Sequence, residues 1–242
     1  MTTLTKFIVG LIVLFMLMSC QFNSNFGIGV RGNGNVETIE RHINENFNEI
    51  RVSRGLDVYL TQSDNISLVV QADENLHNII MTEVENNILR IYADENINYA
   101  ASRKVMVNFK DINKISSSSG SDVYSTNKIK TESLELSTSS GSDMELEVDT
   151  NVIECSSSSG SDLQLSGKTD KLYADASSGS DIKAGNLKTN SCEARASSGA
   201  DITVNTSKEL YAKASSGGDI KYYGNPEKIS KKDGVSGSIR KQ

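Results

Sequence analysis

The chain has 242 residues, of which 37% are hydrophobic and 6% aromatic, with one proline and no tryptophan. This length suits one sizeable domain or two small ones. The formal net charge of −6 excludes general nucleic-acid binding, because proteins that bind phosphate backbones need a basic surface.

The N-terminal segment has the features of an export signal. Lys6 is followed by an apolar run over 7–19, which has the length of a signal-peptide core and is too short for a typical membrane span. Leu-Met-Ser-Cys at 17–20 resembles a bacterial lipobox, in which the cysteine is lipidated and starts the mature chain. We therefore predict a lipoprotein signal peptide over 1–19 and a lipidated Cys20. A plain N-terminal membrane anchor is the alternative.

Residues 20–36 are rich in Gly and Asn and lack a hydrophobic period. A segment of this composition behaves as a flexible tether. We therefore expect a membrane-anchored lipoprotein of the cell envelope, attached to the outer membrane and facing either the periplasm or the surface. The side stays open, because no acidic cluster follows Cys20.

A short motif recurs six times at a nearly constant interval. It reads Ser-Ser-Gly-Ser-Asp in four copies, then Ser-Ser-Gly-Ala-Asp and Ser-Ser-Gly-Gly-Asp. The six glycines are Gly120, Gly141, Gly160, Gly179, Gly199 and Gly217. An interval of about 20 residues is typical of a solenoid, whereas a flexible linker has no reason to keep one.

Apolar or small residues alternate with polar residues on both sides of each glycine. In the third copy, Ile153 and Cys155 precede Gly160 at alternate positions, and Leu163 and Leu165 follow it. A period of two predicts strands, and the motif between them predicts a tight turn. We therefore predict an all-β fold, a single-stranded right-handed parallel β-helix (β-solenoid) with coils of about 20 residues.

The same frame extends beyond the regular coils, which cover 113–223. Residues 49–60 keep it around Gly55, and strand-like segments follow at 66–70, 88–92 and 105–109. We predict one continuous β-helix domain over 37–242. Its early coils are irregular, and a C-terminal cap over 224–242 closes the open end.

These segments resemble the head GIN domain family. The resemblance rests on FNEIRVSRGLDVYLTQ (47–62), NLHNIIMTEVENNILRIY (75–92), the serial SSGSD turns and YYGNPEKI (222–229), and it covers roughly residues 40–240. It implies a parallel β-helix on a secreted or lipid-anchored bacterial protein, and the family is named for autotransporter adhesins. The resemblance brings no catalytic residues.

One aspartate ends each motif and forms a column of carboxylates. The column is Asp122, Asp143, Asp162, Asp181, Asp201 and Asp219. Stacked about 4.8 Å apart, these charges repel, so we expect each to accept hydrogen bonds from its own turn. A row of calcium ions and a catalytic carboxylate cluster are the alternatives. One aspartate per coil supplies few of the six to eight oxygens that calcium prefers.

Other residues with reactive side chains are few. His42 and His77 lie in the early coils, far along the chain from most turns, so the serines lack a nearby base. Cys155 and Cys192 occupy inward columns two coils apart, beyond the ~7 Å limit for a disulfide, and are expected to be buried free thiols. We predict no catalytic residue and no cofactor.

The outward columns contain a group of aromatic and charged residues. Tyr173 and Tyr211 lie two coils apart with Glu193 between them, and Arg195 and Lys213 follow two residues further on. Such a group on a flat sheet can bind a glycan or a protein. Ordinary solvated surface is the alternative, because tryptophan is absent.

We therefore predict a non-enzymatic, lipid-anchored extracytoplasmic protein that presents a rigid surface for adhesion or envelope scaffolding. Its expected partners are the membrane, through the lipid, and a glycan or protein ligand. The oligomeric state stays open. One alternative is a polysaccharide lyase or glycosidase, which requires a groove of clustered Asp, Arg or Lys that departs from the repeat. The other is an envelope sensory component that binds a partner protein.

Overall fold

Strands dominate the structure. The computed structural model of the chain describes residues 29–43 and 45–242, so the predicted signal peptide and Cys20 lie outside the described residues. Strands account for 68% of the structure, and a short 3-10 turn, η1 (Glu74–Leu76), interrupts them near the N-terminal end. Within the described ranges, no helix has the length and hydropathy to cross a membrane.

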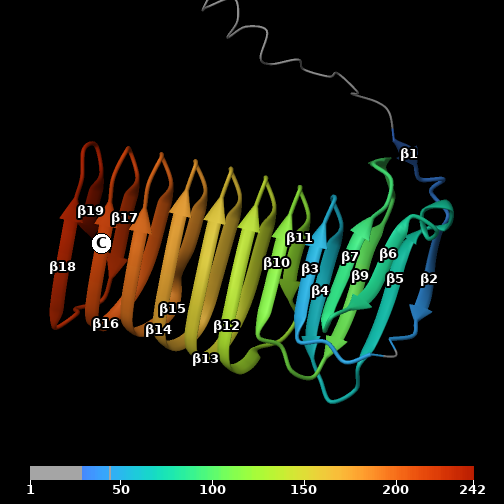
Figure 1. Cartoon of the computed structure of the whole chain (residues 1–242), viewed down its shortest axis with the longest axis horizontal. Coiled ribbons are helices and arrows are strands. Elements are labelled where there is room, and N and C mark those ends of the chain that lie inside the picture. Colours follow the sequence, from blue (N-terminus) through green and yellow to red (C-terminus); the bar gives the residue numbers. More distant parts are fainter. Residues whose placement is uncertain (1–28, 44) are drawn as a thin grey trace, which may run out of the picture.

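The regular coils form an elongated β-solenoid (Figure 1). The long strands run up to the next turn motif, all but the first of them start at a motif aspartate, and neighbouring strands pair in parallel. These strands are β12 (Ile129–Ser139), β13 (Asp143–Ser158), β14 (Asp162–Ser177), β15 (Asp181–Ala196) and β16 (Asp201–Ala214). The solenoid has about seven turns with coils about 19 residues apart, which confirms the predicted all-β solenoid of parallel coils.

Each coil contributes one arm to each of two sheets. The arm before a turn motif belongs to what we call the pre-turn sheet, and the arm after it to the post-turn sheet. In β14, Leu163 and Leu165 of the post-turn arm and Leu172 and Ala174 of the pre-turn arm are all buried. Inward and outward positions alternate along the strand, which confirms the predicted period of two.

The early coils do not stack in chain order. The coil around Gly55 pairs in parallel with the first regular coil on one side and with a later pair of strands on the other. Along the axis the strands are β7 (Ile88–Ala93) and β9 (Arg103–Phe109), then β3 (Glu49–Ser53) and β4 (Asp57–Gln62), then β10 (Lys114–Ser118) and β11 (Asp122–Ser125). Among the solenoid coils, the chain thus forms the coil of β3 and β4 first. It then forms the coil of β7 and β9 on the N-terminal side of that coil, and the coil of β10 and β11 on the other side. The prediction of irregular early coils left their order open, and the structure places them out of chain order.

An antiparallel cap closes the N-terminal end of the solenoid. β2 (Val36–Arg41) and β5 (Ser67–Asp73) extend the post-turn sheet beyond β9, and β6 (Ile80–Glu85) extends the pre-turn sheet beyond β7. β6 and β7 form a hairpin through Asn86 and Asn87, whose φ angles of 51° and 65° suit a two-residue hairpin turn. Figure 1 shows this cap at the end opposite β18 and β19.

Part of the predicted tether is folded. β1 (Val30–Arg31) pairs with β8 (Ile97–Tyr99), and the Gly34 N–H donates to the Asp73 carboxylate at 2.8 Å. The expected flexible tether over 20–36 was therefore wrong for its last residues, since hydrogen bonds hold them against the cap. Its earlier part lies outside the described residues.

The segment 224–242 forms one more coil of the solenoid. β18 (Lys228–Asp233) pairs with the pre-turn arm of β16, and β19 (Ser238–Lys241) pairs with β17 (Asp219–Tyr223). Both are edge strands, and every residue of β18 is exposed. Charged side chains on these strands discourage pairing at an otherwise open sheet edge.

Candidate binding surface

A buried serine occupies the fourth position of each of the first four turn motifs, and in the second to fourth copies its hydroxyl bonds across its own turn. In the third copy, Ser159 and Gly160 have φ angles of 57° and 68°, which turn the chain, and Ser161 is fully buried. The Ser161 hydroxyl accepts a hydrogen bond from the Ser158 N–H at 3.2 Å and lies 2.8 Å from the Ser158 carbonyl. The aspartates of the column make no such side-chain bond to their own turns within the described part. The expected aspartate cap was wrong.

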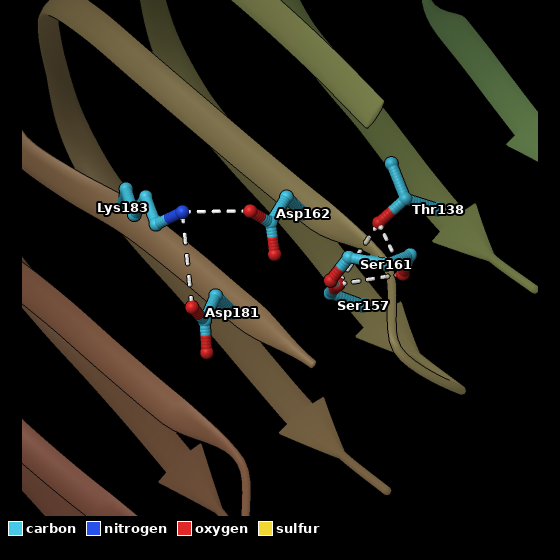
Figure 2. Close-up of polar contacts among 6 residues, drawn as sticks. All are labelled: Thr138, Ser157, Ser161, Asp162, Asp181 and Lys183. Atoms are coloured by element: carbon cyan, nitrogen blue, oxygen red, sulfur yellow. Dashed lines mark hydrogen bonds and ion pairs between the residues drawn. The ribbon is translucent and has the colours of Figure 1, made fainter. Parts of the chain in front are cut away.

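Buried hydroxyls also join one coil to the next (Figure 2). The side-chain oxygens of Thr138, Ser157 and Ser161 lie 2.9–3.1 Å from one another. All three residues are at most 1% exposed, so these bonds satisfy polar groups that burial would otherwise leave unpaired. His77 lies in the N-terminal cap, away from these serines, with its Nε2 3.3 Å from the Glu37 carbonyl. The hydroxyls therefore act as structural hydrogen-bonding groups.

Nearby positive charge offsets only part of the negative charge of the aspartate column. Lys183 Nζ lies 2.6 Å from Asp162 and 3.7 Å from Asp181 (Figure 2). Burial and then the neighbouring carboxylate of Asp162 raise the pKa of Asp181 despite this lysine. Burial, followed by Asp143 and Asp57, likewise raises the pKa of Asp122. Among residues 29–43 and 45–242, no group of three His, Cys, Asp or Glu residues is placed to hold a metal ion, so the column gives the calcium alternative no support.

A shallow groove of about 420 Å³ lies on the outer face of the pre-turn sheet, across β12 to β15. Its side chains include Glu135, Glu154, Asp175, Glu193, Tyr173 and Arg195. These residues come from successive coils, because parallel register places Glu154, Tyr173 and Glu193 side by side on three strands. Stacking therefore builds the groove from positions far apart in the chain.

The structure brings together two of the four predicted surface residues in this groove. Tyr173 and Arg195 line it, and Tyr173 is 41% exposed. Tyr211 and Lys213 lie on the next strand, in register with Glu193 and Arg195, and do not line it. The four residues thus share one face, but only the first two form the groove.

The groove is acidic. The Arg195 guanidinium is paired with Glu193, so its charge is neutralised within the groove. Three further carboxylates, on Glu135, Glu154 and Asp175, line the same groove. Sequence reasoning missed these three, although the columns six and four residues before each motif glycine contain them.

The groove offers no arrangement typical of a polysaccharide lyase or glycosidase. Its side chains occupy the repeating columns, rather than a site that departs from the repeat. Two of its carboxylates are also held in ion pairs, Glu193 with Arg195 and Glu135 with Lys114 at 2.7 Å. These contacts leave the enzyme alternatives without structural support.

Cys155 and Cys192 are free and buried, which confirms the expectation from their inward columns. Burial raises the pKa of the Cys192 thiol to about 12 and raises that of Cys155 still further. A thiol with so high a pKa is a poor nucleophile at neutral pH, since the thiolate is the reactive form. Both residues therefore act as small core side chains.

The chain is thus a β-solenoid, a class of repeat protein in which stacked coils form an extended surface. Residues 46–226 match the family described as "Putative auto-transporter adhesin, head GIN domain", and the chain belongs to this family. The predicted resemblance is thus confirmed.

Several solved bacterial structures share the fold. A "putative adhesin" from Bacteroides fragilis aligns with a TM-score of 0.82 over 88% of this chain and 100% of that chain, at 24% identity. A "Putative lipid binding protein" from Parabacteroides distasonis aligns with a TM-score of 0.73 over 88% and 99%, at 26% identity. A "putative adhesin" from Parabacteroides merdae aligns with a TM-score of 0.71 over 88% and 98%, at 18% identity.

These comparisons support a coarse assignment. No curated protein matches the chain. Membership of an adhesin family supports an adhesion-like, non-enzymatic role and a place at the cell envelope or surface. The neighbours below 25% identity support the fold alone.

Proposed function

We propose that this protein is a lipid-anchored, extracytoplasmic adhesin that binds a ligand in the groove of its pre-turn sheet. The observation that carries the proposal is the groove itself, in which an exposed Tyr173 lies among four carboxylates on a stack of rigid coils. The family supports adhesion, and the lipobox at Cys20 supports the anchor.

The chemistry of the groove favours a neutral or amine-bearing glycan, or a protein segment with basic side chains. Carboxylates accept hydrogen bonds from sugar hydroxyls and pair with amines. The ring of Tyr173 offers an apolar face against which a sugar or an aliphatic side chain can pack. An acidic groove repels an acidic ligand, so the groove and its ligand are expected to differ in charge.

The direct test is a binding array of glycans and host-matrix proteins, with and without EDTA. The probe is the chain from residue 20 with Cys20→Ala, which cannot be lipidated. We expect binding that EDTA does not change, and Tyr173→Ala should weaken it about tenfold by removing the packing surface. Tyr223→Ala is the matched control, because Tyr223 is similarly exposed but lies on the post-turn sheet.

Three outcomes would contradict the proposal as stated. Silence on every ligand would argue against adhesion. Equal loss of binding in both tyrosine variants would argue against the groove. Loss of binding in EDTA would indicate that binding requires a cation, and the aspartate column would then be a candidate site for it.

The anchor is tested separately from the binding. In cells, the wild-type chain is expected in the membrane fraction, and metabolic labelling with a fatty acid is expected to mark it. Cys20→Ala should abolish the label and weaken retention, because each buried methylene of an acyl chain contributes about 0.8 kcal/mol of membrane affinity. Unchanged retention of Cys20→Ala would favour the uncleaved membrane anchor instead.

A further inference from the structure

A second pocket of about 390 Å³ lies on the same outer face, nearer the N-terminal cap, where β7, β3 and β10 meet. Its polar side chains are Arg51, Arg54, Arg90, Tyr92, Ser116 and Ser118, with Ser53 between them. Its lining contains no carboxylate, whereas four carboxylates line the acidic groove. The two pockets therefore have opposite electrostatic character on one face.

Two of the arginines lie directly opposite each other. Arg90 of β7 and Arg51 of β3 occupy one register position, with Ser116 of β10 next in the row. Like charges at opposed positions destabilise a sheet. Some outward lysines instead meet a carboxylate of the adjacent coil, as Lys114 meets Glu135 at 2.7 Å and Lys128 meets Glu147 at 3.1 Å.

The flanking carboxylates leave most of both guanidinium groups free. Glu49 binds Arg51 at Nε at 2.5 Å, and Glu85 approaches Nε of Arg90 only to 3.8 Å. Nε of Arg90 is buried and has no hydrogen-bond partner in the described part of the chain. A buried donor without a partner is costly. The Arg90 side chain as a whole is 43% exposed, so an acceptor that enters the pocket can reach the exposed part of this side chain.

The third arginine is held in place. Arg54 donates from Nη1 to the carbonyls of Ala93 at 2.9 Å and Asp94 at 3.1 Å, and its guanidinium lies 5.7 Å from the centre of the Tyr92 ring. These contacts fix the group through Nη1, and its Nη2 donates no hydrogen bond among the residues that the structure describes. Fixed donors lose less conformational entropy on binding than flexible ones.

Hydroxyl groups complete the pocket. Ser53 of β3 lies beside Tyr92 of β7, and Ser118 ends β10 on the same face. Across the residues that the structure describes, the hydroxyls of Ser53, Ser116 and Ser118 make no side-chain hydrogen bond. The pocket thus presents cationic and hydroxyl donors together.

We propose that Arg51, Arg54 and Arg90 bind an oxyanion, a sulfate, phosphate or carboxylate group carried by an acidic glycan. Guanidinium groups bind such anions through paired, charge-assisted hydrogen bonds. The serine hydroxyls suit the hydroxyls of the sugar that carries the group. The one aliphatic residue in the pocket lining, Val52, is buried, so the lining itself offers no aliphatic side chain for insertion into a lipid surface. The glycan as carrier rests on the proposed adhesion function, while the anion site does not.

The test is titration calorimetry of the non-lipidated Cys20→Ala chain with inorganic sulfate, a sulfated oligosaccharide and its desulfated counterpart. We expect the sulfated oligosaccharide to bind at least about tenfold more tightly than the desulfated one, with affinity that falls as salt rises. Arg90→Gln should lose the preference for the sulfated oligosaccharide. Arg90→Lys should retain part of this preference, because the lysine ammonium keeps the positive charge but not the paired donors of a guanidinium. Arg195→Gln, in the acidic groove, is the matched control and should bind sulfate like the wild type.

Thermal unfolding of each variant separates lost binding from lost folding. Arg90→Gln should unfold no earlier than the wild type without ligand, since it removes a like-charge pair. Equal affinity for both oligosaccharides, or unchanged sulfate affinity in folded Arg90→Gln, would overturn the anion site.

The anion site and the proposed adhesion function are tested by different variants, so one can be contradicted without the other. Tyr173→Ala should keep its sulfate affinity even where it loses ligands of the groove. If the protein binds inorganic sulfate but does not bind the sulfated oligosaccharide, the assignment of a glycan as the carrier is overturned. Arg90-dependent binding to vesicles of anionic phospholipid that exceeds binding to the oligosaccharide would do the same.

Discussion

At each corner of the regular coils, the fourth residue of the turn motif is small and buried. Ser121, Ser142, Ser161 and Ser180 fill this position in the first four copies. Ala200 and Gly218 replace them in the last two, where a backbone N–H bonds across the turn instead, to the carbonyls of Ser197 and Ser215. The same corner can therefore be closed by a hydroxyl or by the backbone.

Removal of one corner hydroxyl is expected to cost stability. Ser161→Ala leaves the Ser158 N–H and the buried hydroxyls of Thr138 and Ser157 with fewer partners, so the free energy of unfolding should fall by about 1–2 kcal/mol. Urea denaturation measures this free energy of unfolding. Ser156→Ala, at an exposed position of β13 just before this turn, should change the free energy of unfolding by less than about 0.5 kcal/mol. Equal losses in the two variants would contradict the corner role.

The aspartate column is expected to oppose stability where no lysine reaches it. Burial and neighbouring carboxylates raise the pKa of Asp122, so the native state holds this proton to higher pH than the unfolded chain. Stability should therefore fall as pH rises from about 4 through the raised native pKa. Asp122→Asn removes this loss and should stabilise the protein at pH 7, by less than about 1 kcal/mol because the group is partly exposed.

Thermal unfolding between pH 3 and 7 checks this expectation. Asp162→Asn is the control, because it also removes the contact with Lys183 at 2.6 Å and should not gain stability. A less stable Asp122→Asn at pH 7 would show that the carboxylate makes a favourable contact that outweighs repulsion.

At the scale of elements, one buried carboxylate joins the N-terminal segment to the cap. Asp73, at the end of β5, is fully buried and accepts hydrogen bonds from the N–H groups of Gly34 at 2.8 Å, Ala101 at 2.9 Å and Ser102 at 2.9 Å. Burial alone would raise its pKa, but these bonds outweigh burial and lower it. Gly32 is required beside it, since a Cβ there would lie 2.1 Å from the carboxylate oxygen.

Asp73→Asn is expected to loosen the cap. The amide keeps one acceptor oxygen and loses the charge, so the three N–H groups are less well satisfied. The free energy of local unfolding of the cap should therefore fall by about 1–3 kcal/mol. Hydrogen exchange should quicken at residues 30–34 and 97–102 before the regular coils respond. In the wild type, a lowered native pKa means that this stability is present above the usual pKa of about 4 and is lost as pH falls through the native value. Unchanged hydrogen exchange in the variant would contradict the role of Asp73 in joining the N-terminal segment to the cap.

At the scale of the whole molecule, the two ends of the solenoid are closed by different means. The N-terminal end has the antiparallel cap, whereas the last coil places Lys231 and Asp233 in the inward columns that Ala212 and Ala214 occupy in the coil before. Lys231 Nζ lies 4.6 Å from the centre of the Tyr222 ring and so covers the end of the core. Inward charges on an edge strand oppose the addition of another strand.

Loss of these charges is expected to promote association. Lys231→Leu combined with Asp233→Ala creates an apolar, unpaired edge, and size-exclusion chromatography with light scattering should show a larger mass that grows with concentration. Lys232→Leu is the control, because Lys232 lies in the outward column with Lys213 and leaves the inward columns intact. A double variant with the same mass as the wild type at every concentration would contradict edge protection by Lys231 and Asp233.

The sequence by itself determined the solenoid, its coil length and the buried free thiols of Cys155 and Cys192. Each of these depends on a local property, because the period of two and the constant interval can be read along any short stretch of the chain. It also placed Tyr173 and Arg195 on one outward face, since residues at equivalent positions of successive coils stack.

Only the tertiary structure decided which coils are neighbours at the N-terminal end. The coil around Gly55 lies between strands that follow it in the chain, and that order depends on apolar contacts between segments far apart in sequence. For the same reason, the opposed pair of Arg51 and Arg90 had no local signal. Local alternation specifies which side chains point outward, but the packing of distant segments specifies which of them meet.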